Sequence, residues 1–131
     1  MNKEIEEKFV NNFLVKDKRE RIIHELGSAK KRESALQRIY SLLDRKYAVL
    51  ESNNVSDEEL ISVLKKYFNT NHECYIISET DDDCKVIPFQ QALENMNRYE
   101  VNYLIICNDN TALMSEEYTT YGSPYKIILH K

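Results

Sequence analysis

The feature that most constrains the fold is an apolar run near the end of the chain, from Tyr99 to Asp109. A strand with one face in water alternates apolar and polar residues, so a run without alternation indicates a strand that is covered on both faces. We therefore expect a buried central strand here, covered by helices, by other strands or by one of each. Its apolar residues are Val101, Tyr103, Leu104, Ile105, Ile106 and Cys107.

The first half of the chain carries the spacing of amphipathic helices. Between residues 4 and 15, apolar side chains recur at i, i+4 and i+8, which predicts a helix with one buried face. Asp17 is a suitable N-cap for a short second helix, and Gly27 is a suitable left-handed residue to end it. Ser28 is then the predicted N-cap of a third helix, from about residue 29 to about residue 43.

A capping box predicts a fourth helix. Ser56 and Glu59 stand three residues apart at the start of an apolar pattern, so each side chain can satisfy a free backbone N–H of the other. The residues expected to face inward are Leu60, Ile61, Leu64 and Phe68. For residues 45 to 50, the local pattern leaves two alternatives open, an extension of the third helix or a short edge strand.

The pattern changes from helical to extended after residue 71. Besides the central run, strands are predicted at 73–78, 85–87, 111–114 and 125–129. Pro88 predicts the start of a fifth helix over residues 89–97, because proline suits the first turn of a helix. The inward face of this helix is expected to hold Phe89, Ala92, Leu93 and Met96. The order strand, helix, strand around it predicts two parallel strands joined by a right-handed crossover.

These elements predict an α+β fold. Three to four N-terminal helices would pack against a small mixed sheet of three to five strands from the C-terminal half, with one strand-helix-strand unit. The length of 131 residues is that of one domain, so we expect a single domain over residues 1–131. Its helical half would span about residues 3–68, and its sheet-containing half about residues 72–131.

The composition indicates a cytoplasmic protein. No apolar run approaches the roughly 20 residues of a membrane span, and the acidic N-terminal segment lacks the pattern of a signal peptide. The cysteines Cys74, Cys84 and Cys107 show no Cys-x-x-Cys spacing, so we expect reduced structural thiols. We expect no membrane interaction, and the sequence leaves the oligomeric state open.

Charge is distributed unevenly along the chain. Residues 16–46 carry ten Lys or Arg against five Asp or Glu, a local charge of +5, and the remaining residues carry eight against seventeen, or −9. Such a division indicates an acidic partner for the basic segment or a basic partner for the acidic remainder.

The basic segment suggests nucleic-acid binding as an alternative function. If the third helix is continuous, Lys31, Arg38 and Arg45 recur every seven residues and share one stripe, which would neutralise phosphates. The helix, glycine, helix order also invites a helix-turn-helix interpretation. Ile23 and Glu33 argue against that motif, because it requires a small residue and an aliphatic residue at those positions. A solvated helical surface is therefore the favoured interpretation of this segment.

A second alternative is a metal-dependent hydrolase. Asp83 and Lys85 form an Asp-x-Lys sequence in which the lysine could assist a metal-bound water. The acidic run Glu79 to Asp83 lacks the central glycine and the closing glutamate of a calcium loop, so a solvated hairpin turn is the simpler interpretation. The three histidines lack metal-ligand spacing, and neither glycine belongs to a phosphate-binding loop. We therefore expect no metal and no cofactor.

The leading hypothesis is a non-enzymatic protein-binding module of regulatory or toxin-neutralising type. The last third of the chain combines tyrosines with carboxylates, and tyrosine is frequent at binding hot spots, whereas acidic rims attract basic partners. The predicted contact residues are Tyr99, Glu116, Glu117, Tyr118 and Tyr121. The competing explanation is that half-buried strands simply favour aromatic residues. The expected partner is another protein, with nucleic acid as the alternative.

Overall fold

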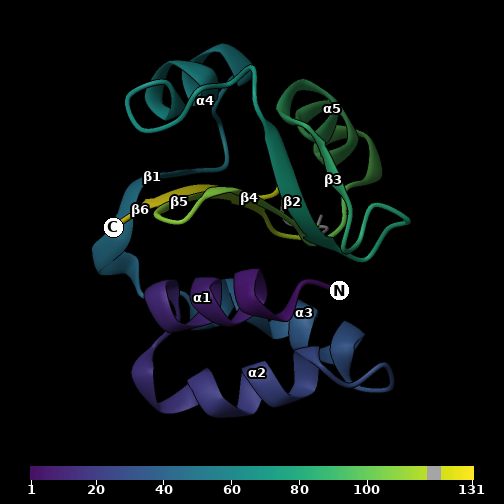
Figure 1. The fold of residues 1–131 in the computed structure, drawn as a ribbon. Coiled ribbons are helices and arrows are strands. Elements are labelled where there is room, and N and C mark those ends of the chain that lie inside the picture. Colours follow the sequence, from purple (N-terminus) through teal and green to yellow (C-terminus); the bar gives the residue numbers. More distant parts are fainter. Residues whose placement is uncertain (118–121) are drawn as a thin grey trace.

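Over the residues that the structure describes, the fold consists of five α-helices and one six-stranded sheet (Figure 1). A computed structural model describes residues 1–117 and 122–131. The helices are α1 (Lys3–Phe13), α2 (Arg19–Leu26), α3 (Arg32–Leu42), α4 (Asp57–Leu64) and α5 (Phe89–Tyr99). The strands are β1 (Ala48–Ser52), β2 (Glu73–Ser78), β3 (Val86–Pro88), β4 (Tyr103–Asn108), β5 (Thr111–Ser115) and β6 (Lys126–His130). Two short 3₁₀ turns, η1 (Lys16–Lys18) and η2 (Arg45–Tyr47), connect elements of the first half.

The strand order is β1-β6-β5-β4-β2-β3, and every neighbouring pair is antiparallel. The α+β class is confirmed, but the sheet is antiparallel rather than mixed and has one strand more than the predicted maximum. The physical reason is the short turn between β2 and β3, which returns the chain as a hairpin. Because β2 lies between β3 and β4, those two strands run in the same direction without pairing. Helix α5 joins them, as the strand-helix-strand prediction required.

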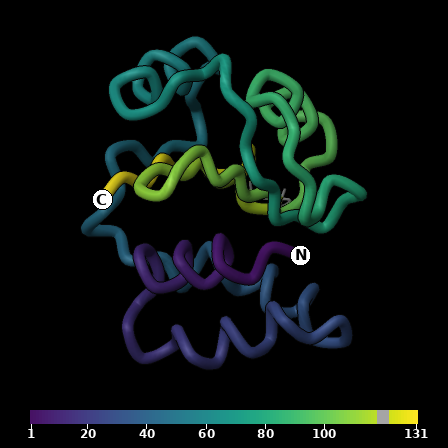
Figure 2. Tube along the Cα trace, viewed as in Figure 1, coloured from purple at the N-terminus to yellow at the C-terminus, as the bar shows by residue number. Residues whose placement is uncertain are grey.

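Helices cover both faces of the sheet. Helices α1, α2 and α3 lie on one side, α4 and α5 lie on the other, and the Cα trace shows the same two helical layers (Figures 1 and 2). The central run is confirmed as a strand that is buried on both faces. Leu104 and Ile106 belong to the core under α1–α3, whereas Tyr103 and Ile105 belong to the core under α4 and α5. Within the described residues, no helix has the length and apolar character needed to cross a membrane.

The starts of α2 and α3 differ from the prediction. Asp17 lies inside η1, which runs directly into α2, and no side chain caps that helix. Gly27 follows α2 with a φ of −77°, which is right-handed rather than left-handed. Ser28 does not cap α3 either, because its carbonyl accepts from the backbone N–H of Arg32 in a preceding turn. In each case the backbone of an adjoining turn takes the place of the expected cap.

The Ser56 cap of α4 and the fifth helix are confirmed, whereas the Glu59 side chain accepts from Ser56 Oγ at 3.5 Å rather than from the backbone N–H of Ser56. Ser56 Oγ accepts a hydrogen bond of 3.1 Å from the backbone N–H of Glu59, and Pro88 directly precedes α5. Helix α4 ends at Leu64, so the buried Phe68 reaches the core from the turn that follows. The predicted inward residues of α5 are all buried, namely Phe89, Ala92, Leu93 and Met96. Residues 45–50 form η2 and the beginning of β1, so the edge-strand alternative is the correct one.

The Ser56 cap leads to a stability prediction. Replacing Ser56 with Ala removes the side-chain acceptor for the first turn of α4, and we expect the free energy of unfolding to fall by about 1 kcal/mol. Replacing it with Asp, another good capping residue, should leave the value within a few tenths of a kcal/mol of the wild type. Urea unfolding curves of the three proteins would measure the difference. Equal loss in both variants would contradict the capping role.

Candidate functional site: the acidic end of the sheet

The strand register aligns one row of residues across the sheet. Ser78 of β2 lies opposite Tyr103 of β4, which lies opposite Ser115 of β5, and Ser115 lies opposite Lys126 of β6. Lys126 in turn lies opposite Ser52 of β1. The segments that leave these strands therefore meet at one end of the sheet.

Carboxylates gather around this row. They come from the β2–β3 turn, from the segment between α5 and β4, and from the residues after β5. We call the set the acidic end, and it consists of Glu79, Asp81, Asp82, Asp83, Glu100, Glu116 and Glu117. Asp81, Glu100 and Glu117 are exposed, and the other four are partly buried. Seven of the seventeen carboxylates outside residues 16–46 thus lie at one end of the sheet, on three separate segments.

Two exposed tyrosines lie at the same end. Tyr99, the last residue of α5, is 46% exposed, and Tyr125, just before β6, is 43% exposed. The backbone N–H of Tyr125 donates to Glu116 Oε1 at 3.2 Å, and the N–H of Glu116 donates to the carbonyl of Tyr125 at 3.0 Å. This pairing fixes one tyrosine beside one carboxylate of the acidic end.

The structure brings together three of the predicted contact residues, Tyr99, Glu116 and Glu117. Tyr118 and Tyr121 lie outside the described residues. Tyr125 and Glu100 were missing from the predicted set, and the predicted strands included them, whereas β6 and β4 begin after them. The signal that could have found them is the register, since residues flanking the same ends of antiparallel neighbours converge.

The β2–β3 turn is a hairpin turn, as predicted, but it is more than a solvated loop. Asp82 Oδ2 accepts hydrogen bonds from the hydroxyl of Tyr103 at 2.6 Å and from Asn95 Nδ2 at 2.8 Å. Glu79 Oε2 accepts from the side chain of Asn102 at 3.4 Å. Burial of Tyr103, together with its hydrogen bond to Asp82, raises the pKa of that tyrosine above its ordinary value. These bonds fix the turn to β4 and α5.

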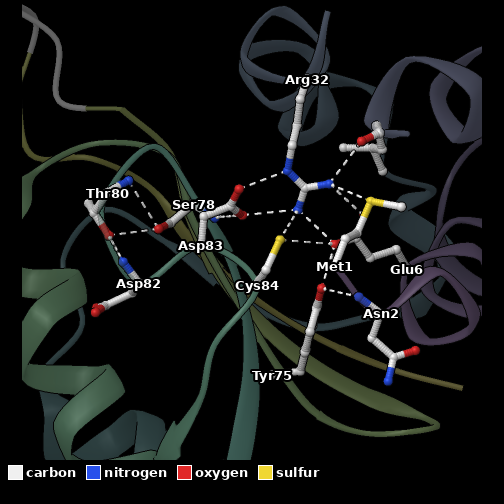
Figure 3. Close-up of polar contacts among 11 residues, drawn as sticks. Met1, Asn2, Glu6, Arg32, Tyr75, Ser78, Thr80, Asp82, Asp83 and Cys84 are labelled. Carbon is white, nitrogen blue, oxygen red and sulfur yellow. Dashed lines mark hydrogen bonds and ion pairs between the residues drawn. The ribbon is translucent and has the colours of Figure 1, made fainter. Parts of the chain in front are cut away.

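Asp83 joins the turn to the helical layer through Arg32 (Figure 3). Arg32 Nε and Nη2 donate to the two oxygens of Asp83 at 2.8 and 3.0 Å, while Nη1 and Nη2 donate to the two oxygens of Glu6 at 2.7 Å each. Only 13% of the Arg32 side chain and 3% of the Glu6 side chain are exposed. Burial alone would lower the pKa of Arg32, but the hydrogen bonds that it donates to its two carboxylate partners outweigh burial and raise it.

Further polar groups complete this network. The hydroxyl of Tyr75 donates to Glu6 Oε2 at 2.7 Å and accepts from the backbone N–H of Asn2 at 3.0 Å. Arg32 Nη2 also lies 3.2 Å from Cys84 Sγ, and Cys84 has a φ of +67°, in the left-handed region. Within the described residues, no buried side-chain nitrogen or oxygen lacks a hydrogen-bond partner. The network is therefore internally satisfied, as a structural element should be.

The two residues of the hydrolase alternative have separate environments. Both oxygens of Asp83 are bound by Arg32, and Oδ1 also accepts from the backbone N–H of Ser78 at 3.1 Å. Lys85 is exposed and lies just before β3. Over residues 1–117 and 122–131, no group of three or more His, Cys, Asp or Glu side chains is placed to hold a metal ion. Asp83 thus has a structural role in the Arg32 network.

The three residues of the nucleic-acid alternative do not share one helix. Lys31 precedes α3 and is exposed, Arg38 lies within α3, and Arg45 lies in η2 beyond its end. Arg38 forms an ion pair with Glu25. Arg45 forms one with Glu51 at 3.1 Å. The condition of a continuous third helix is not met, and two of the three cations already have carboxylate partners.

No protein-family model matches the chain, and no curated protein or solved structure is significantly similar to it. A function therefore has to be inferred from the geometry of its own residues.

The Arg32 network leads to a second stability prediction. Replacing Arg32 with Met leaves the buried Glu6 and the partly buried Asp83 without their counter-charge, and we expect a loss of about 3–5 kcal/mol in the free energy of unfolding. Arg98 is exposed on α5, so Arg98→Met is a matched control that should change the value by less than about 0.5 kcal/mol. Chemical denaturation would measure the free energy of unfolding of the two variants. If Arg32→Met lowered it as little as Arg98→Met does, the network would add no stability.

The buried tyrosines predict a loss of stability in alkali. Burial, with hydrogen bonds to Glu51, Glu6 and Asp82 respectively, raises the pKa of three tyrosine hydroxyls above the ordinary value: Tyr40, Tyr75 and Tyr103. A folded-state pKa above the unfolded one gives stability that is complete below the unfolded pKa, about 10, and is lost as pH rises above it.

Urea unfolding at several pH values from about 8 to about 11 should therefore show a falling free energy above about pH 10. Tyrosinate absorbance should show a group of tyrosines that ionise only as the protein unfolds. In the Tyr103→Phe variant, the pH-dependent fall should be smaller. Ionisation of all nine tyrosines in a single step with the fold intact would contradict the prediction.

Proposed function

We propose that this protein is a non-enzymatic protein-binding module whose acidic end binds a basic surface of another protein. The observation that supports this most directly is the register of the sheet, which gathers seven carboxylates from separate segments at one end. A local excess of one sign attracts the opposite charge and speeds the encounter with a complementary partner. The acidic end is therefore suited to a partner rich in lysine or arginine.

The charges at the acidic end are not all neutralised within the molecule. In the described residues, Glu100, Glu116 and Glu117 form no ion pair, whereas Asp83 is paired with Arg32. Most ion pairs of the basic segment 16–46 stay local, such as Arg21 with Glu25. Internal pairing therefore removes only part of the charge asymmetry and leaves exposed carboxylates for a partner.

The tyrosines add contact area beside these charges. Tyr99 and Tyr125 each combine an apolar ring with a hydroxyl group, and they are more than two-fifths exposed. Tyrosine contributes strongly to binding energy when a partner covers it, because a large ring is desolvated at a small cost in side-chain entropy. A regulatory role and a toxin-neutralising role both require such a surface, since each depends on covering a site on another protein.

A pull-down under two salt conditions tests the proposal. The wild-type chain, immobilised and exposed to lysate of its source organism at low salt, should retain a protein in stoichiometric amount and release it at high salt. The variant Glu100→Gln/Glu116→Gln/Glu117→Gln should lose most of this retention. The matched control Glu4→Gln/Glu20→Gln/Glu73→Gln removes the same charge from exposed positions outside the acidic end and should retain the partner.

Two results would count against the proposal. One is the absence of any stoichiometric partner at low salt. The other is equal loss of retention in both triple variants, because net charge rather than the acidic end would then govern binding. Retention that depends instead on Lys31, Arg38 and Arg45 and is abolished by nuclease treatment would favour the nucleic-acid alternative.

A further inference from the structure

Two cysteines face each other across neighbouring strands. Tyr75 of β2 lies opposite Ile106 of β4, and the next position outward in the same register places Cys74 opposite Cys107. Side chains alternate between the faces of a sheet, and both thiols belong to the core under α4 and α5. Cys74 is near enough to Cys107 to contribute, with burial, to a raised pKa of the Cys107 thiol.

We infer that Cys74 and Cys107 form an oxidisable dithiol, a modification site that a small peroxide converts into a disulfide between β2 and β4. Residues directly opposite in an antiparallel pair have Cα atoms about 4.5–5.5 Å apart. Disulfides require Cα separations of about 4.4–6.8 Å. The strand pairing therefore places the Cα atoms of Cys74 and Cys107 at a separation that a disulfide can span.

The reaction is balanced with hydrogen peroxide as the oxidant. The thiol of one cysteine loses its proton, and the thiolate attacks a peroxide oxygen, so the O–O bond breaks and a sulfenic acid and hydroxide form. The hydroxide takes up the released proton and leaves as water. The second thiol then attacks the sulfenic sulfur, and the S–S bond forms as the S–O bond breaks. The leaving hydroxide takes up the proton of this thiol and departs as a second water. The protein loses two hydrogen atoms, and peroxide is reduced to two molecules of water.

The site favours a small oxidant and a slow reaction. Cys74 is 2% exposed and Cys107 is 7% exposed, so a bulky reagent has no direct access. Hydrogen bonding to Cys74, with burial, raises the pKa of Cys107, which keeps the thiolate fraction small at neutral pH. Strand β3 is three residues long and covers the outer side of β2, so brief opening of this edge would admit peroxide.

The third cysteine does not compete for this bond. Cys84 packs against the core under α1–α3, beside Arg32, and the sheet separates it from the other two thiols. Replacing it with Ser therefore leaves the pair as the only thiols of the chain, and in this background any disulfide within one molecule has to join Cys74 and Cys107.

Intact-mass spectrometry of the Cys84→Ser protein after peroxide treatment tests the inference. We expect a loss of two hydrogen atoms, reversal by a reducing agent, a cross-linked peptide joining Cys74 to Cys107, and a higher urea midpoint for the oxidised form. The controls Cys74→Ser/Cys84→Ser and Cys107→Ser/Cys84→Ser keep one thiol each and should show no loss of two hydrogens.

The inference is overturned if the thiols of the Cys84→Ser protein gain oxygen atoms singly, or if both stay free after treatment that oxidises the urea-unfolded chain. It is also overturned if disulfides form only between molecules. Circular dichroism before treatment establishes that each variant is folded, so the absence of the disulfide can be assigned to the geometry of the pair.

Discussion

The guanidinium of Arg32 is the interaction on which the rest of this structure depends. It joins α1, α3 and the β2–β3 turn, whose residues Glu6, Arg32 and Asp83 are far apart in the sequence, through four hydrogen bonds to carboxylate oxygens. Removing such a charge from water is costly unless every donor finds an acceptor. Here each carboxylate receives two bonds, so the helical layer and the acidic end of the sheet hold each other in place.

Patterns with local causes were predictable from the sequence. The apolar run of β4, the proline before α5 and the Ser56 cap of α4 depend on neighbours along the chain, and the structure confirms them. Gly27 and Ser28 were assigned wrongly because adjoining turns supply their backbone partners. The predicted mixed sheet was wrong because local patterns do not reveal which strands become neighbours. The insertion of β2 between β3 and β4 is a property of the whole sheet.

The candidate site was predictable in composition but not in arrangement. Tyr99, Glu116 and Glu117 could be selected from charge and residue type alone, whereas the separation of free from neutralised carboxylates could not. Asp83 looked as available as its neighbours, yet its counter-ion Arg32 lies 51 residues away in the sequence. Charge counts treat all carboxylates alike, and only the folded chain distinguishes the buried pair from the exposed acids.

The position of the acidic end has a consequence for how such a protein can change over time. Helices cover both faces of the sheet, so substitutions there disturb packing on one side or the other. Exposed residues beyond the strand ends have few packing partners and tolerate replacement more readily. A lineage carrying this fold could therefore acquire new binding preferences through the residues around 100 and 117 while its framework stayed constant. Diversity among descendants would then be concentrated at one pole of the molecule.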